Sequence, residues 1–315
     1  MVCVDKSVSG MNRLRRSTVE FKTHVLEYIA EQKDAGLKLM DVLHQSMELS
    51  GRMIRRSKKE KAIHLNNQRV SLSSRIRKGD LITIEMEMEK NIFEPQDIPI
   101  QVVFEDADLL IVNKQPFLVV HPTKGHPTGT LANGIAKLFL DEGLDIKIRF
   151  INRLDRDTSG LMMIAKNPYA QTVISEQMIA GTVTKEYLAI VQGRIEKDKG
   201  TIDAPIGLEN ENDIERKVME GGKACVTHYE VVKRFDNASL VKIQLETGRT
   251  HQIRVHFRHI GHTLFGDELY GGNHDLIDRQ ALHCTRMVFK LARPSEEIEL
   301  HADMPDDMLA LIEKL

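Results

Sequence analysis

The sequence predicts an α+β fold in which a large mixed, mainly antiparallel sheet flanked by helices follows a small α/β domain. Strand-like runs dominate the second half of the chain, at 183–191, 226–235 and 240–246. No regular alternation of strands and helices, which would indicate a parallel sheet, is visible. The 315 residues are also too many for one small core and indicate about two domains.

Composition excludes several classes of protein. Hydrophobic residues make up 41% and charged residues 29%, as in an ordinary globular chain. No apolar run approaches the roughly 20 residues that a bilayer requires. The N-terminus, MVCVDKSVSG, lacks the layout of a signal peptide, so we expect a cytoplasmic protein without a membrane partner. Three widely spaced cysteines predict no disulfide framework.

Positive charge is concentrated near the N-terminus. Residues 1–90 hold 18 Lys and Arg against 12 Asp and Glu, although the chain as a whole has a net charge of −2. Within 50–80 the count is 10 basic against 2 acidic residues. Such a block indicates a module that binds a polyanion. A solvated, lysine-rich helix face is the alternative interpretation.

Local patterns divide the chain into four segments. We expect a flexible tail over 1–20, a small basic domain over 21–90, a proline-flanked linker over 91–99 and a larger domain over 100–315. In the small domain, Ser50 reads as the N-cap of a short helix that carries the arginines, and Asn66 with Asn67 reads as a hairpin turn.

The larger domain mixes strands and helices. Strands are expected at 109–112, 118–120 and 161–165. Helices are expected at 131–140, at 168–178 and after Pro305.

The segment Arg-Leu-Asp-Arg-Asp-Thr-Ser-Gly at 153–160 stands between two strand-like runs. An aspartate in a turn between buried strands can be held rigidly, as a nucleophile or an acid–base group must be. Asp155 and Asp157 are therefore candidates for catalysis. The alternative is that they only bond the backbone amides of the Thr-Ser-Gly turn.

Two further segments carry candidate functional side chains. The first is the segment 245–254, Leu-Glu-Thr-Gly-Arg-Thr-His-Gln-Ile-Arg. Arg249 follows a tight turn there and could keep a carboxylate ionised. Thr250 reads as the N-cap of a helix. Arg249 could equally be an ordinary surface cation. In Lys-Glu-Tyr-Leu-Ala at 185–189, Tyr187 lies on one face of a strand, where core tyrosines are also common.

In this order, the motifs R-L-D-x-x-T-S-G, K-x-Y-x-A and L-x-T-G-R-T-H-Q-I-R-V-H resemble those of the RluA-type family of RNA pseudouridine synthases. The segments 121–131 and 266–271 are similar to that family as well, so the resemblance covers about residues 100–300. The basic domain resembles, less closely, the RNA-binding domain named after small-subunit ribosomal protein four. Its phosphate-facing residues would be Arg52, Arg55, Arg56, Lys58 and Lys59.

One position departs from the family pattern. The first motif usually begins His-Arg-Leu-Asp, whereas this chain has Asn152 before Arg153. Asparagine forms hydrogen bonds but does not titrate near neutral pH. Because the rest of the motif is present, we interpret this position as structural, with reduced activity or an unusual target as the alternative.

The resemblance implies an isomerase whose essential carboxylate is Asp155, acting by attack at the anomeric carbon or by proton abstraction from the ribose. Arg249 would pair with Asp155 and keep it ionised. Tyr187 would stack on the flipped uracil and could take the proton left at carbon five, and Arg153 would fill the space that the nucleotide vacates. Asn152 and Thr158 would complete the substrate-binding residues.

The resemblance also implies that neither a cofactor nor a metal is needed, because the substrate already contains every atom of the product. The sequence has no phosphate-binding loop, and its histidines at 251, 256, 259 and 262 lack the H-E-x-x-H pattern. Structured RNA is the expected partner, ribosomal RNA of the large subunit first and transfer RNA second, with no obligate protein partner.

Two other functions stay open at the level of sequence. The first is a non-catalytic RNA-binding or ribosome-assembly factor on the same fold. The second is a glycosidase or nucleoside hydrolase that uses Asp155 with Asp157, although two carboxylates so close in sequence need not face one sugar.

Overall fold

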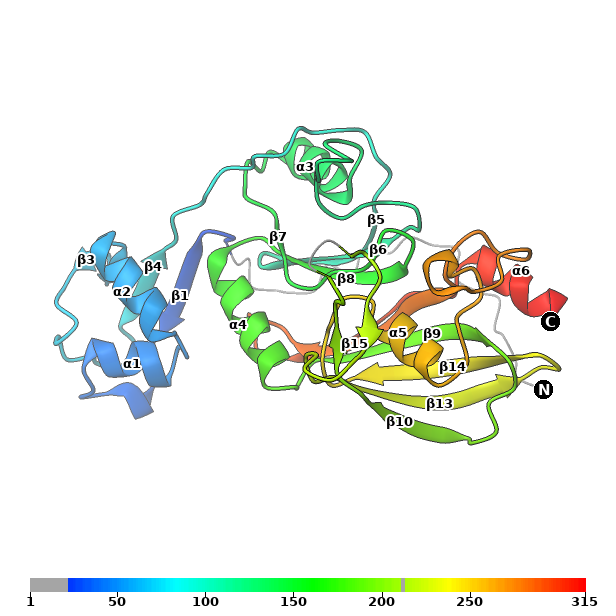
Figure 1. The fold of residues 1–315 in the computed structure, drawn as a ribbon. Coiled ribbons are helices and arrows are strands. Elements are labelled where there is room, and N and C mark those ends of the chain that lie inside the picture. The colour runs from blue at the N-terminus through cyan, green and yellow to red at the C-terminus, as the bar shows by residue number, and fades with distance from the viewer. Residues whose placement is uncertain (1–21, 211–212) are drawn as a thin grey trace.

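The computed structural model describes residues 22–210 and 213–315, which form a small N-terminal lobe and a larger C-terminal lobe (Figure 1). The tail predicted over 1–20 lies outside the described residues. Residues 86–100, which include the predicted linker, join the lobes without a helix or strand. Among the described residues, no helix is long and apolar enough to cross a membrane.

The small lobe packs two helices, α1 (Leu39–Gln45) and α2 (Gly51–Lys59), on a four-stranded antiparallel sheet. In sheet order the strands are β1 (Val25–Ile29), β4 (Leu81–Glu85), β2 (Ile63–Leu65) and β3 (Gln68–Arg69). Its core is aliphatic, and each of its central side chains is at most 1% exposed: Leu39, Val42, Leu43, Ile54, Ile82 and Ile84. This lobe therefore has a hydrophobic core of its own.

Two local predictions for the small lobe are confirmed. The Ser50 hydroxyl accepts a hydrogen bond from the Met53 amide at 3.3 Å, as an N-cap does. Asn66 and Asn67 both have positive φ, +52° and +64°, which suits the tight turn between β2 and β3.

The large lobe is built on a ten-stranded sheet, and the predicted α+β class is confirmed. Eight strands follow the order β10-β13-β14-β9-β15-β8-β6-β5, with β16 beside β15 and β7 beside β8. All pairs are antiparallel except β15 with β8. The bounds are β5 Gln101–Glu105, β6 Leu109–Lys114, β7 Arg149–Phe150, β8 Ser159–Ala165, β9 Thr184–Gln192, β10 Lys199–Asp203, β13 Val226–Arg234, β14 Ala238–Leu245, β15 Leu282–Lys290 and β16 Glu297–His301.

Short elements complete the large lobe. Strands β11 (Ile206–Gly207) and β12 (Lys217–Val218) form a separate pair. The helices are α3 (Leu131–Asp141), α4 (Pro168–Ile179), α5 (Gln252–His259) and α6 (Asp306–Lys314), and a 3-10 turn spans Glu268–Tyr270. A second 3-10 turn, Gln32–Asp34, lies in the small lobe between β1 and α1. Figure 1 places α4 between the sheet and the small lobe.

Two local predictions for the large lobe are wrong. Residues 118–120 do not form a strand, because the Val119 and Val120 carbonyls instead accept hydrogen bonds from the first amides of α3, at 2.8 and 3.1 Å. The N-cap of α5 is His251 rather than Thr250, since His251 adopts the left-handed conformation at φ +57° that turns the chain into the helix.

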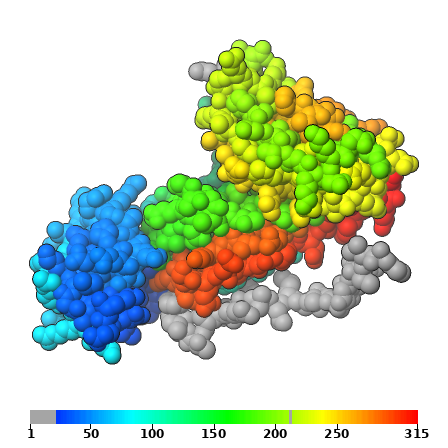
Figure 2. Space-filling view, turned by 90° about the horizontal axis from the view of Figure 1, so that it is seen from below, coloured from blue at the N-terminus to red at the C-terminus, as the bar shows by residue number. Residues whose placement is uncertain are grey.

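A buried ion pair connects the lobes. The Arg293 guanidinium bonds the Asp108 carboxylate at 2.6 and 2.7 Å and also donates to the carbonyls of Lys22 and Val25 in the small lobe. The side chain of Asp108 is fully buried. Figure 2 shows the small lobe packed against α4 and the orange C-terminal segment, and Tyr169 of α4 contributes to the cores of both lobes.

The one parallel strand pair, β8 with β15, is held by a side-chain hydrogen bond at its start. His283 Nδ1 lies 2.9 Å from the Ser159 hydroxyl, and Nε2 lies 3.2 Å from the Ala302 carbonyl. The carbonyl requires a donor at Nε2, and burial lowers the pKa of His283 to about 4, so at pH 7 the imidazole is neutral and Nδ1 accepts from the Ser159 hydroxyl. Because Ser159 directly follows the 153–158 segment, this contact fixes one end of it.

We expect stability to fall as the pH drops from about 6.5 to 4. Burial lowers the pKa of His283 to about 4, so the imidazole is protonated in the unfolded chain before it is in the folded one. The shift corresponds to about 3 kcal/mol of unfolding free energy. In urea titrations, the stability advantage of wild type over His283→Gln should shrink between pH 7 and pH 4.5. If the difference in unfolding free energy between wild type and His283→Gln does not change with pH, the low pKa of His283 is contradicted.

Candidate active site

A cleft of about 880 Å³ opens beside the 153–158 segment, between the turn that follows α4 and the ends of β13 and β14. Asp155 and Tyr187 lie in its lining. The other predicted site residues in the lining are Asn152, Arg153 and Arg249. Five candidates from three separate motifs are therefore brought together by the fold.

Asp155 is held in a short turn between β7 and β8. Its carbonyl accepts a hydrogen bond from the Thr158 amide at 3.2 Å, and the neighbouring Leu154 is anchored in the core, 6% exposed. The Asp155 side chain itself is 19% exposed and faces the cleft. The carboxylate is thus oriented by the backbone yet open to a ligand.

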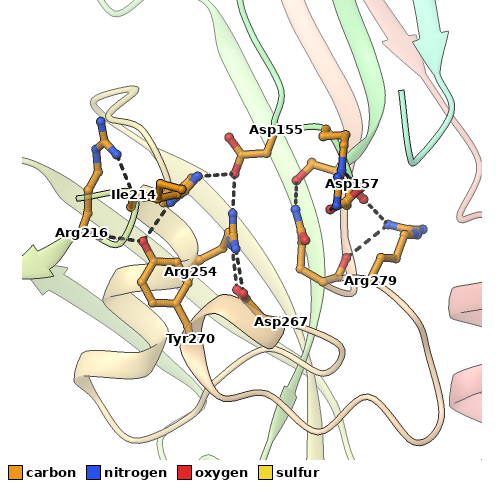
Figure 3. A network of polar contacts seen from close by, with 12 residues as sticks. Asp155, Asp157, Ile214, Arg216, Arg254, Asp267, Tyr270 and Arg279 are labelled. Carbon is orange, nitrogen blue, oxygen red and sulfur yellow. Dashed lines mark hydrogen bonds and ion pairs between the residues drawn. The ribbon is translucent and has the colours of Figure 1, made fainter. Parts of the chain in front are cut away.

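The cation that pairs with Asp155 is Arg254. One of its nitrogens donates to Asp155 Oδ2 at 3.1 Å, while two others bond the Asp267 carboxylate at 2.7 and 2.8 Å (Figure 3). Burial lowers the pKa of Arg254, but the contacts with Asp267 and Asp155 outweigh this and raise it above its ordinary value. The guanidinium is therefore permanently charged and lies in contact with the Asp155 carboxylate.

The expected ion pair between Arg249 and Asp155 is not formed between these described residues. Arg249 does line the cleft, but its Nε donates to the Ala224 carbonyl at 3.4 Å and its amide donates to the Gln252 side chain at 3.0 Å. Arg249 precedes α5, whereas Arg254 lies on the buried side of that helix, 7% exposed. The sequence feature that could have identified Arg254 is its position between the apolar residues Ile253 and Val255 in a short helix.

His251 completes the surroundings of the carboxylate. Its Nε2 lies 3.8 Å from Asp155 Oδ2, and its Nδ1 lies 2.9 Å from the Tyr270 hydroxyl. Burial lowers the pKa of His251 below its ordinary value. The imidazole is therefore neutral at pH 7, and the positive charge at Asp155 comes from Arg254.

Tyr187 lies on β9 and its ring is 6% exposed. Burial, with a smaller contribution from Cys284 across the strand pair, raises the pKa of Tyr187 well above its ordinary value. The neutral phenol is thus the form present at neutral pH. This suits stacking on a base better than accepting a proton.

Together, these contacts make a half-buried carboxylate, paired with a buried guanidinium, beside an aromatic side chain in an open cleft. Residues 108–259 match the model of a family described as RNA pseudouridylate synthase. The uncharacterized RNA pseudouridine synthase YjbO of Bacillus subtilis is 40% identical over 254 residues, which are 79% of this chain and 89% of YjbO. This chain belongs to the RluA-type RNA pseudouridine synthases.

Other comparisons agree with this membership. Ribosomal large subunit pseudouridine synthase D of Escherichia coli is 39% identical over 250 residues, 75% of this chain and 76% of that protein. The solved structure of human RNA pseudouridylate synthase domain containing 1 superposes with a TM-score of 0.54 at 26% identity, over 67% of this chain and 86% of that one. The protein is accordingly an isomerase that acts on RNA.

Asn152, where the family usually has histidine, has a structural bonding pattern in this synthase. Its side-chain oxygen accepts from the Met163 amide at 2.7 Å, and its amide group donates to the Leu161 carbonyl at 3.4 Å. Both partners lie on β8, so the side chain extends the β7–β8 pairing up to the Asp155 turn. Such bonding needs no titratable group, which supports the structural interpretation of this position.

Thr158 and Asp157 face away from the open cleft. Thr158 is 2% exposed and its hydroxyl accepts from Gln280 Nε2 at 3.1 Å, although it contributes to a small cavity behind Asp155. The Asp157 carboxylate bonds Arg156 at 2.7 and 2.9 Å and is not part of the cleft lining. A hydrolase with paired carboxylates at 155 and 157 is therefore disfavoured by the geometry.

Lys114 was not singled out by the sequence, although it supports the site. This fully buried ammonium donates to the carbonyls of Gln115, Leu118 and Arg156 at 2.8 to 3.0 Å. It thereby ties the end of β6 to the Asp155 turn. The available signal was a lysine at the end of an otherwise apolar, buried strand.

The basic residues predicted to face phosphates all lie on α2 of the small lobe and are exposed: Arg52, Arg55, Arg56, Lys58 and Lys59. Arg56 is partly neutralised, since it bonds Glu60 at 2.7 Å and Glu87 at 3.2 Å. Within the described ranges, no group of three or more His, Cys, Asp or Glu side chains is arranged to hold a metal ion.

Replacing Arg254 should destabilise the fold as well as the site. In Arg254→Gln the fully buried Asp267 loses its partner, and an unpaired buried charge costs about 3–5 kcal/mol of unfolding free energy. Chemical denaturation measures this loss. The matched control is Arg258→Gln on the same helix, whose exposed ion pair with Glu215 should contribute less than about 1 kcal/mol. Equal losses in the two variants would contradict the assignment.

Proposed function

We propose that this synthase isomerises specific uridines in structured RNA, large-subunit ribosomal RNA first and transfer RNA second, with Asp155 as the essential carboxylate. The observation that carries the proposal is the Asp155–Arg254–Asp267 arrangement at the cleft. The relatives named ribosomal large subunit pseudouridine synthase D support the choice of ribosomal RNA.

The chemistry breaks the bond between ribose C1′ and uracil N1, turns the base and rejoins it through C5. Asp155 acts either by attack at C1′ or by removing a proton from the ribose. Both routes need the carboxylate form of Asp155, and the permanently charged Arg254 lies 3.1 Å from it. No redox change occurs, so the reaction itself requires no cofactor.

The target base must leave its helix or loop to reach Asp155. Flipping costs a few kcal/mol, least for a uridine in a loop or bulge. Arg153, exposed at the cleft, is placed to fill the space that the nucleotide vacates, and Tyr187 to stack on the uracil. Stacking on an aromatic side chain contributes about 1–3 kcal/mol per base.

We expect Asp155→Asn to abolish isomerisation while RNA affinity changes little, because the amide cannot replace an ionised carboxylate. RNA from cells lacking this protein, labelled with tritium at uridine C5, is incubated with enzyme, and tritium released to water is counted. The control is Asp157→Asn, which removes a carboxylate outside the cleft and should retain activity.

Release by Asp155→Asn at the wild-type rate would overturn the catalytic assignment. Binding without release by the wild type would favour the non-catalytic RNA-binding factor, and Asn152→His would then be tested for activity. Free uracil among the products would indicate hydrolysis instead.

We propose that the small lobe, which resembles the RNA-binding domain named after small-subunit ribosomal protein four, supplies phosphate contacts through α2. Each contact to single-stranded RNA should contribute about 0.7 to the slope of log affinity against log salt. Arg52→Gln with Arg55→Gln should therefore lower that slope by about 1.4. Arg56→Gln is the matched control, because its charge is already shared with Glu60 and Glu87. An unchanged slope in the double variant would leave the basic block as a solvated surface.

A further inference from the structure

Lys185 lines the cleft, and neither proposed route of the reaction gives it a role. It lies on β9 two residues before Tyr187, so the two side chains project from the same face of the strand, about 7 Å apart. Both line the cleft together with Asp155. Lys185 as a whole is half-buried.

The ammonium of Lys185 makes no hydrogen bond or ion pair within the described part of the chain. It interacts electrostatically with the Cys284 thiol. The adjacent Glu186 is engaged elsewhere, with Gln244 at 3.4 Å and Arg286 at 4.0 Å. A cation withdrawn from water without a partner costs free energy. Accordingly, burial lowers the pKa of Lys185.

Two buried lysines of this enzyme, Lys114 and Lys166, each have at least two acceptors. Lys114 has three carbonyl acceptors, and Lys166 bonds Glu105 at 2.9 Å and the Asp106 carbonyl at 3.1 Å. Lys185 differs because it lines the cleft and its ammonium has no partner among the described residues. The unmet donor therefore points to an acceptor on the substrate.

We propose that Lys185 is a catalytic residue that donates a hydrogen bond to a carbonyl oxygen of the flipped uracil. The inference rests on the proposed function, because it assumes that a uracil enters this cleft. It places the contact next to the base that Tyr187 would stack on.

The charge changes of the reaction explain why a cation helps there. When the C1′–N1 bond breaks, its electron pair stays on the uracil, whose negative charge spreads over the ring and its carbonyl oxygens. C5 of the turned uracil then uses an electron pair to bond C1′, the hydrogen at C5 leaves as a proton to a base, and N1 takes a proton. An ammonium at a carbonyl oxygen stabilises the anionic stage more than the neutral substrate.

A phosphate is the less suitable acceptor. Lys185 lies within the cleft, on the strand face that Tyr187 shares, where the extruded base enters and the RNA backbone need not follow. Exposed cations for the backbone are available outside the cleft, on α2. The position of Lys185 therefore favours the base over the phosphate.

The test compares Lys185→Met and Lys185→Arg with wild type in single-turnover tritium release at saturating RNA. Lys185→Met should react on the order of 10² more slowly, the usual loss for one donor aimed at developing charge, and Lys185→Arg should recover part of the rate. RNA affinity and its salt dependence should not change. The control is Lys242→Met on the neighbouring β14, whose ammonium pairs with Glu230 at 3.0 Å outside the cleft.

Stability separates this role from a structural one. Because Lys185→Met removes an unpartnered, half-buried cation, its thermal midpoint should equal or exceed that of wild type. If that variant does not fold, Lys185→Gln serves the same comparison. A structural lysine would lower the midpoint in both.

Two results would overturn the proposal. The first is a Lys185→Met enzyme as fast as wild type. The second is a Lys185→Met enzyme that reacts at the wild-type rate with saturating RNA but binds RNA more weakly. If its slope of log affinity against log salt is also smaller by about 0.7, Lys185 contacts a phosphate instead. Failure of the proposed function shows separately, as an absence of tritium release by the wild type.

Discussion

Arg254 holds two carboxylates at once, and the geometry of the site depends on this buried guanidinium. Its forked donors occupy both oxygens of Asp267, which leaves one nitrogen directed at Asp155. Because Asp267 is fully buried, the guanidinium cannot rotate away without leaving a charge unpaired. Asp155 therefore meets a cation whose position and protonation state are both constant, while its own carboxylate stays open to the cleft.

The Asp155 turn is held from several sides by contacts between distant segments. Lys114 bonds the Arg156 carbonyl, Asn152 bonds the backbone of β8, and Ser159 bonds His283. Gly160 adds a steric requirement, because at φ +113° a Cβ atom would lie 2.3 Å from the Cys284 carbonyl oxygen. These constraints provide the rigidity that a catalytic carboxylate needs.

The junction between the lobes shows the same use of buried charge. Asp108 receives Arg293 and Asn167 together, and the Arg293 guanidinium reaches carbonyls of the small lobe. A basic helix on the small lobe is thus presented in a defined orientation to the lobe that contains the cleft (Figure 2). The phosphate contacts proposed for α2 would therefore be made at a fixed position relative to the cleft.

The sequence by itself determined the α+β class, the family and the segment that contains the central aspartate, because these follow from strand patterns and from motifs read in order. It also identified the Ser50 cap and the Asn66–Asn67 turn, which depend on local backbone preferences. Only the tertiary structure decided which arginine pairs with Asp155. Arg249 and Arg254 are equally charged and five residues apart, and burial on α5 against Asp267 distinguishes them. The same holds for Lys114 and Lys185, since whether a lysine is saturated or unpartnered depends on segments far away in the chain.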